Sequence, residues 1–260
     1  MPMFSSPFDS STKALKWCTW VNLGMLAIAL IGMAIDERTL LGENVWHKPV
    51  KFGLSIPVYC ITIALLLKIY PYSFSVKKRI SNIMGWALIL EVPLVMFQAF
   101  RGVRSHFNTT TPLDGIIFGS MGLLILLNTL ALGYMMFTTF TKKLKTSAIM
   151  QRAIQFAWLG MIVSIVAGQQ MLVASGHSVG VEDGGAGMPM THWSTEGGDW
   201  RAVHFLGMHG IQFLPLLTYF LEKKAIKNTA ILVTLTGMGY LIAMGYLYWR
   251  TQVGLPALTV

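Results

Sequence analysis

The chain has 260 residues, of which 54% are hydrophobic and 12% are charged. Soluble domains carry about a quarter charged residues, so this composition excludes an ordinary soluble protein. The formal net charge of +9 comes largely from Lys and Arg in short segments that alternate with segments poor in cations. That alternation is typical of membrane topology, and it excludes a nucleic-acid-binding face as the source of the charge.

Apolar blocks of about twenty residues recur along the chain, and a helix of that length crosses ~30 Å of hydrocarbon. They predict an all-α integral membrane protein, a bundle of about seven transmembrane helices. We expect a single polytopic membrane domain over residues 1–260. The predicted helices lie at about 17–35, 50–69, 80–100, 113–137, 153–174, 203–221 and 230–247. The first block is too long for the core of a signal peptide, so we expect it to be retained.

The basic segments predict the orientation, because Lys and Arg concentrate in cytoplasmic loops. Three such segments lie between predicted helices, around residues 77–79, 142–152 and 223–227, and Lys13 and Lys16 precede the first helix. These positions place the N-terminus in the cytoplasm and the C-terminus outside. The expected location is the plasma (inner) membrane, with the functional face extracytoplasmic.

Glu91 lies near the middle of the third predicted helix, where an ionised side chain costs about 2.5–3.5 kcal/mol. At 100° per residue, Glu91, Gln98, Arg101 and Ser105 share one face of that helix. An intramembrane carboxylate marks either a proton path or ligand site, or a structural hydrogen bond to a neighbouring helix. Both interpretations stay open.

The sixth predicted helix carries a second polar face. Arg201, His204, Met208, His209 and Gln212 fall within an arc of about 140°. His204 and His209 are five residues apart, so they do not form the i, i+4 pair that chelates one metal. Each histidine could still give one nitrogen to a site that other helices complete.

Polar residues gather on the predicted outer side, at the ends of the second, third and fourth helices. All six histidines of the chain fall on that side or in the outer half of the membrane, which favours a one-sided site. The outer residues at these helix ends are Glu43, His47, Lys48, Lys51, Arg101, Arg104, His106, Asn108 and Asp114.

The outer cations run against the positive-inside pattern, so they need an explanation. One explanation is that they pair with the acidic residues of the same side, Glu43, Asp114 or Asp199. The other is a cationic rim that holds a lipid-like or anionic ligand. The cations concerned are Lys48, Lys51, Arg101, Arg104 and Arg201.

The loop over residues 175–202 is the longest, and it is rich in glycine and acidic residues. It is either a flexible exposed loop or a lid over a site at the helix ends. Its Met188, Met190 and His192 are of the types that select copper, although their spacing matches no strict motif. Copper is therefore a weaker prediction than haem iron or zinc.

These patterns predict a membrane-embedded enzyme or redox protein, dependent on a metal or on haem, whose histidine-rich site opens to the extracytoplasmic side. Haem iron needs one or two axial histidines, and catalytic zinc needs three protein ligands. The predicted metal ligands are His47, His106, His204 and His209. The predicted catalytic groups are Glu43, Glu91 and Asp114. The predicted ligand-binding residues are Lys51, Gln98, Arg101, Arg104, Asn108, Arg201 and Gln212.

Two other functions stay open: a proton-linked transporter or channel that uses Glu91, and a non-catalytic assembly subunit. The inner halves of the third and sixth predicted helices are apolar, which disfavours a polar path across the membrane. Gly115 and Gly119 open the fourth helix and allow close helix packing, either within the monomer or in a homo-oligomer.

The helix number resembles that of the alkaline ceramidase and adiponectin-receptor group of zinc hydrolases. The paired i, i+4 histidines that this group carries late in the chain are absent here, so membership is not predicted. The segment 230–247 contains no lysine for a retinal Schiff base, which excludes a microbial rhodopsin. Cys18 and Cys60 are the only cysteines, so no disulfide framework is expected.

Overall fold

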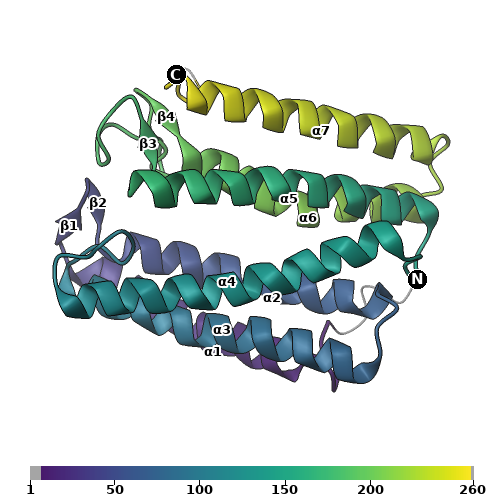
Figure 1. Cartoon of the computed structure of the whole chain (residues 1–260), viewed down its shortest axis with the longest axis horizontal. Coiled ribbons are helices and arrows are strands. Elements are labelled where there is room, and N and C mark those ends of the chain that lie inside the picture. The colour runs from purple at the N-terminus through teal and green to yellow at the C-terminus, as the bar shows by residue number, and fades with distance from the viewer. Residues whose placement is uncertain (1–6, 259–260) are drawn as a thin grey trace. The chain divides into compact units, whose positions relative to one another are not determined.

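The computed structural model describes residues 7–258, which are helical apart from two small hairpins and the connecting loops (Figure 1). The helices are α1 (Lys13–Ile35), α2 (His47–Ile69), α3 (Phe74–Arg101), α4 (Pro112–Thr141), α5 (Ala148–Ala174), α6 (Trp200–Lys223) and α7 (Thr229–Gln252). The hairpins pair β1 (Thr39–Leu40) with β2 (Glu43–Asn44), and β3 (Ser178–Val179) with β4 (Gly198–Asp199), both antiparallel.

Six of the seven helices in residues 7–258 are long and apolar enough to cross a membrane, which confirms a multi-pass helical membrane protein. The exception is α6, which has 24 residues but carries His204, His209 and Gln212 among its apolar ones. Membrane crossing by α6 and the orientation of the termini stay predictions.

Two compact units divide the chain, unit 1 over Met1–Lys145 and unit 2 over Thr146–Val260. In unit 1, α1 packs against α2 and α3, and α3 packs against α4. In unit 2, α5 packs against α6 and α7, and α6 also contacts α7. Residues 1–6 and 259–260 of the predicted single domain lie outside the described residues.

Several helices extend beyond the predicted bounds, mostly at their polar ends. Helix α3 begins at Phe74 instead of residue 80, and α5 begins at Ala148 instead of residue 153. The side chains of Ser73 and Ser147 cap these two helices by accepting hydrogen bonds from backbone N–H groups of the first turn. The predicted bounds follow the apolar residues, but the helical backbone continues into the polar residues next to them. The basic residues 77–79 and Lys13 are therefore helical and do not lie in loops.

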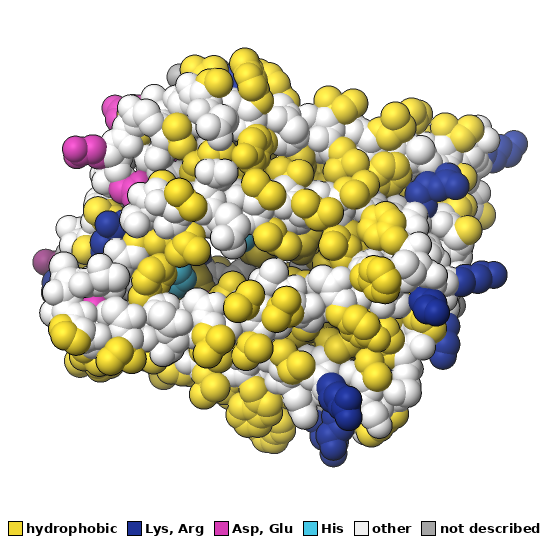
Figure 2. Space-filling model, viewed as in Figure 1, with side chains coloured by type: hydrophobic (Ala, Val, Ile, Leu, Met, Phe, Trp, Pro, Cys, Tyr) yellow, Lys and Arg dark blue, Asp and Glu magenta, His cyan; other side chains and the backbone are white. Residues whose placement is uncertain are grey.

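The helix faces that point away from each unit are apolar. Large hydrophobic side chains such as Trp86, Leu130 and Ile242 are more than half exposed. Within each unit, Lys and Arg side chains stand out at one end of the helices, as Figure 2 shows. An apolar belt bounded by charged ends is the surface expected of helices in a bilayer.

Glycines distinguish packed from unpacked helix faces. A Cβ atom on Gly207 of α6 would lie 2.6 Å from Cβ of Ser164 on α5, so these helices meet at van der Waals contact. A Cβ on Gly115, Gly119 or Gly122 would meet no atom of the described residues within 4 Å. Within the described residues of unit 1, no neighbouring helix packs against Gly115 and Gly119, so both explanations of these glycines stay predictions.

Candidate functional site

Asp114 joins the end of α3 to the start of α4. Its side chain is only 2% exposed, and its Oδ1 accepts hydrogen bonds from Arg101 Nη1 at 2.6 Å and Gln98 Nε2 at 2.9 Å. Its Oδ2 accepts from Thr111 Oγ1 at 2.6 Å, and Thr111 also caps α4 by accepting from the N–H of Asp114. A carboxylate with this many donors is ionised and fixed in place, so it positions the two helix ends.

Lys48 and His106 form a second polar pair in unit 1. Nζ of Lys48 lies 3.1 Å from Nδ1 of His106, and Oγ of Ser105 lies 3.1 Å from the same nitrogen. Burial, with the positive charge of Lys48 adding to it, holds the pKa of His106 well below its usual value. The ring is therefore neutral, and its Nδ1 accepts from the lysine. Three aromatic rings stand with their centroids about 6 Å from that of the imidazole: Phe52, Phe107 and Phe118.

Glu91 is the most unusual group in the molecule. It lies in α3 ten residues before Arg101, about 15 Å along the helix, and its side chain is 1% exposed. Its Oε2 has no hydrogen-bond partner among residues 7–258. Lys48 is close enough for its charge to act on Glu91. A buried carboxyl oxygen without a partner costs free energy that a purely structural role does not require.

Buried polar groups continue beyond Glu91 toward the other end of unit 1. The hydroxyl of Tyr59 donates to Oδ1 of Asn128 at 2.7 Å, and the hydroxyls of Tyr70 and Thr139 are 2.5 Å apart. Asn22 on α1 is also fully buried, and its Oδ1 has no partner among residues 7–258. An apolar inner half is expected of the third and sixth helices, whereas these deeper polar groups of unit 1 come from α2, its C-cap Tyr70 and α4.

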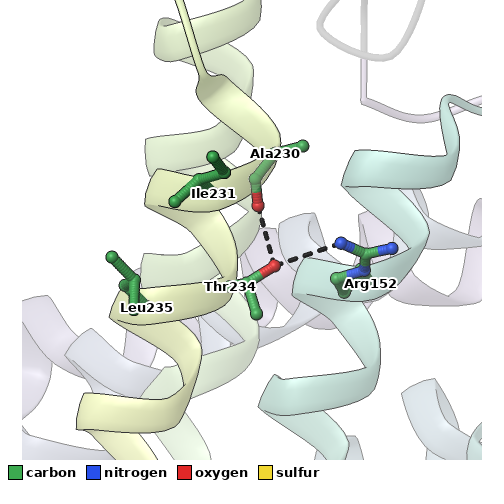
Figure 3. A pocket seen from close by; sticks show the side chains of 5 residues that line it. All are labelled: Arg152, Ala230, Ile231, Thr234 and Leu235. Carbon is green, nitrogen blue, oxygen red and sulfur yellow. Dashed lines mark hydrogen bonds between the residues drawn. The ribbon is translucent and has the colours of Figure 1, made fainter.

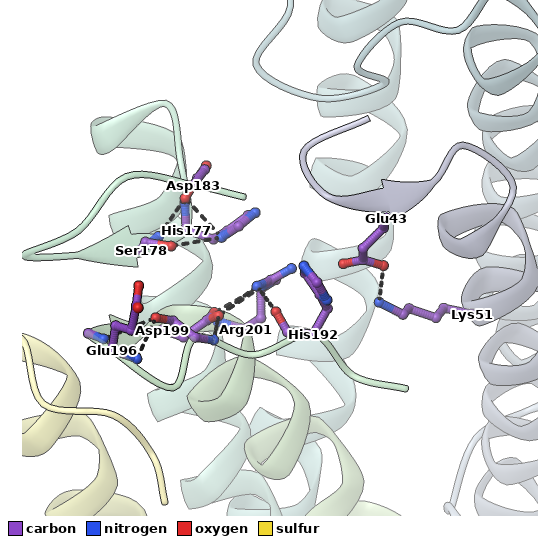
Figure 4. A network of polar contacts seen from close by, with 11 residues as sticks. Glu43, Lys51, His177, Ser178, Asp183, His192, Glu196, Asp199 and Arg201 are labelled. Atoms are coloured by element: carbon purple, nitrogen blue, oxygen red, sulfur yellow. Dashed lines mark hydrogen bonds and ion pairs between the residues drawn. The ribbon is translucent and has the colours of Figure 1, made fainter. Parts of the chain in front are cut away.

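The first hairpin supplies a third polar group. Oε2 of Glu43 on β2 lies 2.5 Å from Nδ1 of His47 and 2.8 Å from Nζ of Lys51, both on the first turns of α2. The pairing of Lys51 with Glu43 is one of those expected from the sequence. Because Glu43 contacts both side chains, it ties the first hairpin to the start of α2. Figure 4 shows its ion pair with Lys51.

In unit 2, two acidic residues hold the 175–202 loop in a folded conformation (Figure 4). Asp199, with no exposed surface, accepts from Nη2 of Arg201 at 2.7 Å and from the N–H of Ser194 at 2.9 Å. Nη2 of Arg201 also donates to the carbonyl of His192, which closes the loop onto the start of α6. These contacts tie the loop to the start of α6, although several of its residues remain exposed.

Asp183 organises the other half of the same loop. Its Oδ1 lies 2.9 Å from Nδ1 of His177 and accepts from the N–H of Ser178 at 2.9 Å. Burial alone would raise the pKa of Asp183, but the hydrogen bonds and charge of His177 and Ser178 outweigh it, and the pKa is lowered overall. The carboxylate is therefore ionised across the neutral range.

His204 is oriented by α5. Its Nδ1 lies 2.9 Å from the backbone carbonyl of Ser164, and Oγ of Ser164 donates to the His204 carbonyl at 2.7 Å. A carbonyl only accepts, so Nδ1 carries the proton and Nε2 keeps its lone pair. Metal-ligating histidines are commonly held in this way. His209 packs its ring on Phe205 with centroids 4.2 Å apart, and it hydrogen-bonds to Gln212.

The structure thus assembles the predicted residues into separate groups. Arg101, Gln98 and Asp114 meet, but Arg104 and Asn108 shape the following loop, where Asn108 Nδ2 donates to the Arg104 carbonyl at 3.2 Å. Ser105 lies outside α3, which ends at Arg101 with Gly102 in the left-handed region (φ +72°). Among residues 7–258, no three His, Cys, Asp or Glu side chains form a group that could hold a metal ion.

Sequence reasoning missed the buried polar residues on α1, α2 and α4, among them Asn22, Tyr59 and Asn128. Each is a single polar residue in an apolar block, and that isolation was the available signal. A surface pocket of about 200 Å³ lies elsewhere, between α5 and α7 (Figure 3). Its one charged residue, Arg152, donates to Oγ1 of Thr234 at 3.1 Å, and neither histidines nor carboxylates line it. No protein-family model, curated protein or solved structure matches the chain.

Proposed function

We propose that the protein is a proton-linked membrane transporter, in which Glu91 of unit 1 takes up and releases the proton. The observation that carries this proposal is the carboxyl of Glu91, buried in α3 and without a hydrogen-bond partner at Oε2 among residues 7–258. Protein interiors rarely leave such an atom unpaired, and an ionisable group inside a membrane helix is by default a functional one.

The polar residues near Glu91 support a proton route that leads from it toward both ends of unit 1. Toward the polar ends of α2–α4, Lys48 exerts its charge on Glu91 and contacts His106 in the loop after α3. Toward the other end, Tyr59 and Asn128 supply hydroxyl and amide groups in an otherwise apolar interior. The free acceptors on Glu91 and Asn22 are positions where water molecules would complete a hydrogen-bonded chain.

The proposed orientation follows the charge distribution. Lysine and arginine lie near the starts of α1, α3 and α5 and the end of α6, which places those helix ends in the cytoplasm. The Lys48–His106 pair and the Asp114 group then face the extracytoplasmic side of the plasma (inner) membrane. In this arrangement α6 crosses the bilayer between α5 and α7, and its packing against both shields its polar residues from lipid.

Proton flux into vesicles tests the proposal. The purified full chain is reconstituted into phospholipid vesicles that contain a pH-sensitive dye, and a potassium diffusion potential drives protons inward. We expect flux above that of empty vesicles for the wild type, loss of that flux in Glu91→Gln, and normal flux in Glu37→Gln. Glu37 is the matched control because it is exposed on the loop of the same unit. Equal flux in Glu91→Gln and wild type would contradict the proposal.

A second candidate function, binding of haem iron or zinc, is favoured by the way His204 is held. The carbonyl of Ser164 fixes Nδ1 as the protonated nitrogen and leaves Nε2 available as a ligand. Elemental analysis for iron, zinc and copper per mole of chain tests this candidate. It requires a near-stoichiometric metal that is lost in His204→Ala and kept in His192→Asn. Metal-free protein that is folded would contradict it.

A further inference from the structure

The two cysteines of the chain face each other across the α1–α2 seam. Cys18 on α1 and Cys60 on α2 are both without exposed surface, and their thiol groups hydrogen-bond to each other. Both are free thiols in this structure. The proton-transport proposal uses neither residue.

Other contacts along the same seam independently require this pairing. A Cβ on Gly32 would lie 2.5 Å from the Trp46 ring, so these two positions face each other near one end of the seam. In two antiparallel helices, a residue a given number of positions before one member of a facing pair lies opposite the residue the same number of positions after the other member. Cys18 lies 14 residues before Gly32, and Cys60 lies 14 residues after Trp46. The two cysteines therefore occupy facing positions.

The seam is also narrow enough for a covalent bond. A Cβ on Gly53 would lie 2.8 Å from Cβ of Leu26, which shows that α1 and α2 approach at close-packed distance. Close-packed helices have axes about 8–10 Å apart, and each Cα lies about 2.3 Å from its axis, so facing Cα atoms are about 3.4–5.4 Å apart. The Cα separations of disulfides, about 4.4–6.8 Å, overlap the upper part of this range.

Polar side chains surround the two sulfur atoms. Nδ2 of Asn22 donates to Sγ of Cys18 at 3.4 Å, and the side chain of Thr19 hydrogen-bonds to Cys60. Cys18 is five residues after the start of α1, about 8 Å along the helix. Its neighbours Trp17 and Trp20 are 62% and 60% exposed, as aromatic residues are at the membrane interface. On α2, Cys60 lies 13 residues after the first residue of the helix and nine before the last, so the thiol pair is buried within the span of that helix.

We infer that Cys18 and Cys60 are a redox-active pair that closes to a disulfide joining α1 to α2. Two S–H bonds break and one S–S bond forms. The two protons and two electrons pass to a lipid-soluble quinone, which leaves as the quinol. The product carries no charge, which suits a buried position, and the sulfur atoms react when the seam opens because neither is exposed.

Thiol counting in vesicles tests this inference. The full chain in phospholipid vesicles is incubated with a short-chain ubiquinone, unfolded in detergent, and labelled with a maleimide. We expect two labelled thiols before oxidation, none after it, and two again after reduction. The oxidised chain should migrate as a monomer, and its intact mass should fall by two hydrogen atoms. The variants Cys18→Ser and Cys60→Ser should each keep one labelled thiol under the same oxidation.

Three results would overturn the inference. They are two labelled thiols remaining in the oxidised wild type, loss of label through cross-linking between copies, and equal loss of label in the single-cysteine variants. Because the readout is chemical and made after unfolding, it does not depend on transport activity. Failure of the proton-flux experiment would therefore leave it untouched.

Discussion

Gln98 of α3 donates a hydrogen bond of 2.9 Å from Nε2 to Oδ1 of Asp114, the third residue of α4. Arg101 donates to the same oxygen, so one carboxylate holds two helix ends together. Two helical turns below Gln98, on the same helix, Glu91 has an oxygen with no partner among residues 7–258. Two acids of one unit thus have opposite environments: both oxygens of Asp114 accept hydrogen bonds, whereas Oε2 of Glu91 accepts none from residues 7–258.

Replacing Asp114 should destabilise the protein. In Asp114→Ala, Arg101 and Gln98 lose their acceptor, and breaking a buried charge pair costs about 3–5 kcal/mol. We expect a clearly lower thermal midpoint in detergent, followed by tryptophan fluorescence. The thermal midpoint of Asp114→Asn should fall less, because the asparagine side chain keeps one oxygen acceptor. An unchanged midpoint in the alanine variant would contradict the positioning role.

Lowering the pH should destabilise the protein through His106. Burial and the charge of Lys48 hold the pKa of His106 well below its usual value of about 6.5. Below that pH the unfolded chain binds a proton that the folded protein does not bind. The contribution of the neutral His106 to the free energy of unfolding is therefore fully present above about pH 6.5. It falls as the pH is lowered, by up to about 1.4 kcal/mol per pH unit.

The thermal midpoint of His106→Asn should accordingly depend less on pH below about 6.5 than that of the wild type. The comparison uses His192→Asn as its control, since that variant also removes one imidazole. If the His106 variant and the wild type show parallel pH profiles, the neutral state assigned to His106 is wrong.

Asp183 should make the loop of unit 2 sensitive to acid. The pKa of Asp183 is lowered in the folded loop. The ionised carboxylate therefore stabilises the loop fully above the ordinary aspartate pKa of about 3.9, and this stabilisation is lost as the pH falls through the lower pKa of the folded state. Limited proteolysis near neutral pH should cut the loop faster in Asp183→Asn than in Glu182→Gln. Equal rates of cleavage would show that Asp183 does not hold the loop.

The helices could be predicted from the sequence because the apolar blocks are long, but their ends could not be predicted from hydropathy. Ser73 and Ser147 are the capping residues that mark the true starts of α3 and α5. For the five outer cations, the sequence offers pairing with acidic residues as one of two explanations and does not assign the partners. Three of the five pair with an acidic residue: Lys51 with Glu43, Arg101 with Asp114 and Arg201 with Asp199. These cations therefore need no bound anion to explain them.

The deeper part of the site could not be predicted, because it depends on which faces of different helices meet. Tyr59 and Asn128 are 69 residues apart in the sequence, and only the packing of α2 and α4 within unit 1 brings them together. The same holds for Ser164 and His204, which are 40 residues apart. Periodicity within one helix gives the direction of a side chain but not its partner.

The open glycine face of α4 should matter for assembly rather than for folding. A leucine at Gly119 has room in the monomer, since a Cβ there meets no described atom within 4 Å. If the chain forms a homo-oligomer through Gly115 and Gly119, Gly119→Leu should lower its mass in detergent, measured by light scattering, without lowering its thermal midpoint. Gly207→Leu should instead impair folding, because α5 is in contact there.

The protonation state of Glu91 is the central claim, and infrared difference spectroscopy measures it directly. The spectrum of the protein in a bilayer is recorded as the bulk pH is changed, and the same series is recorded for Glu91→Gln. The proposal predicts a protonated-carboxyl band that grows as the pH is lowered in the wild type and is absent in the variant. A Glu91 band that does not change over the whole pH range in which the protein stays folded would contradict it.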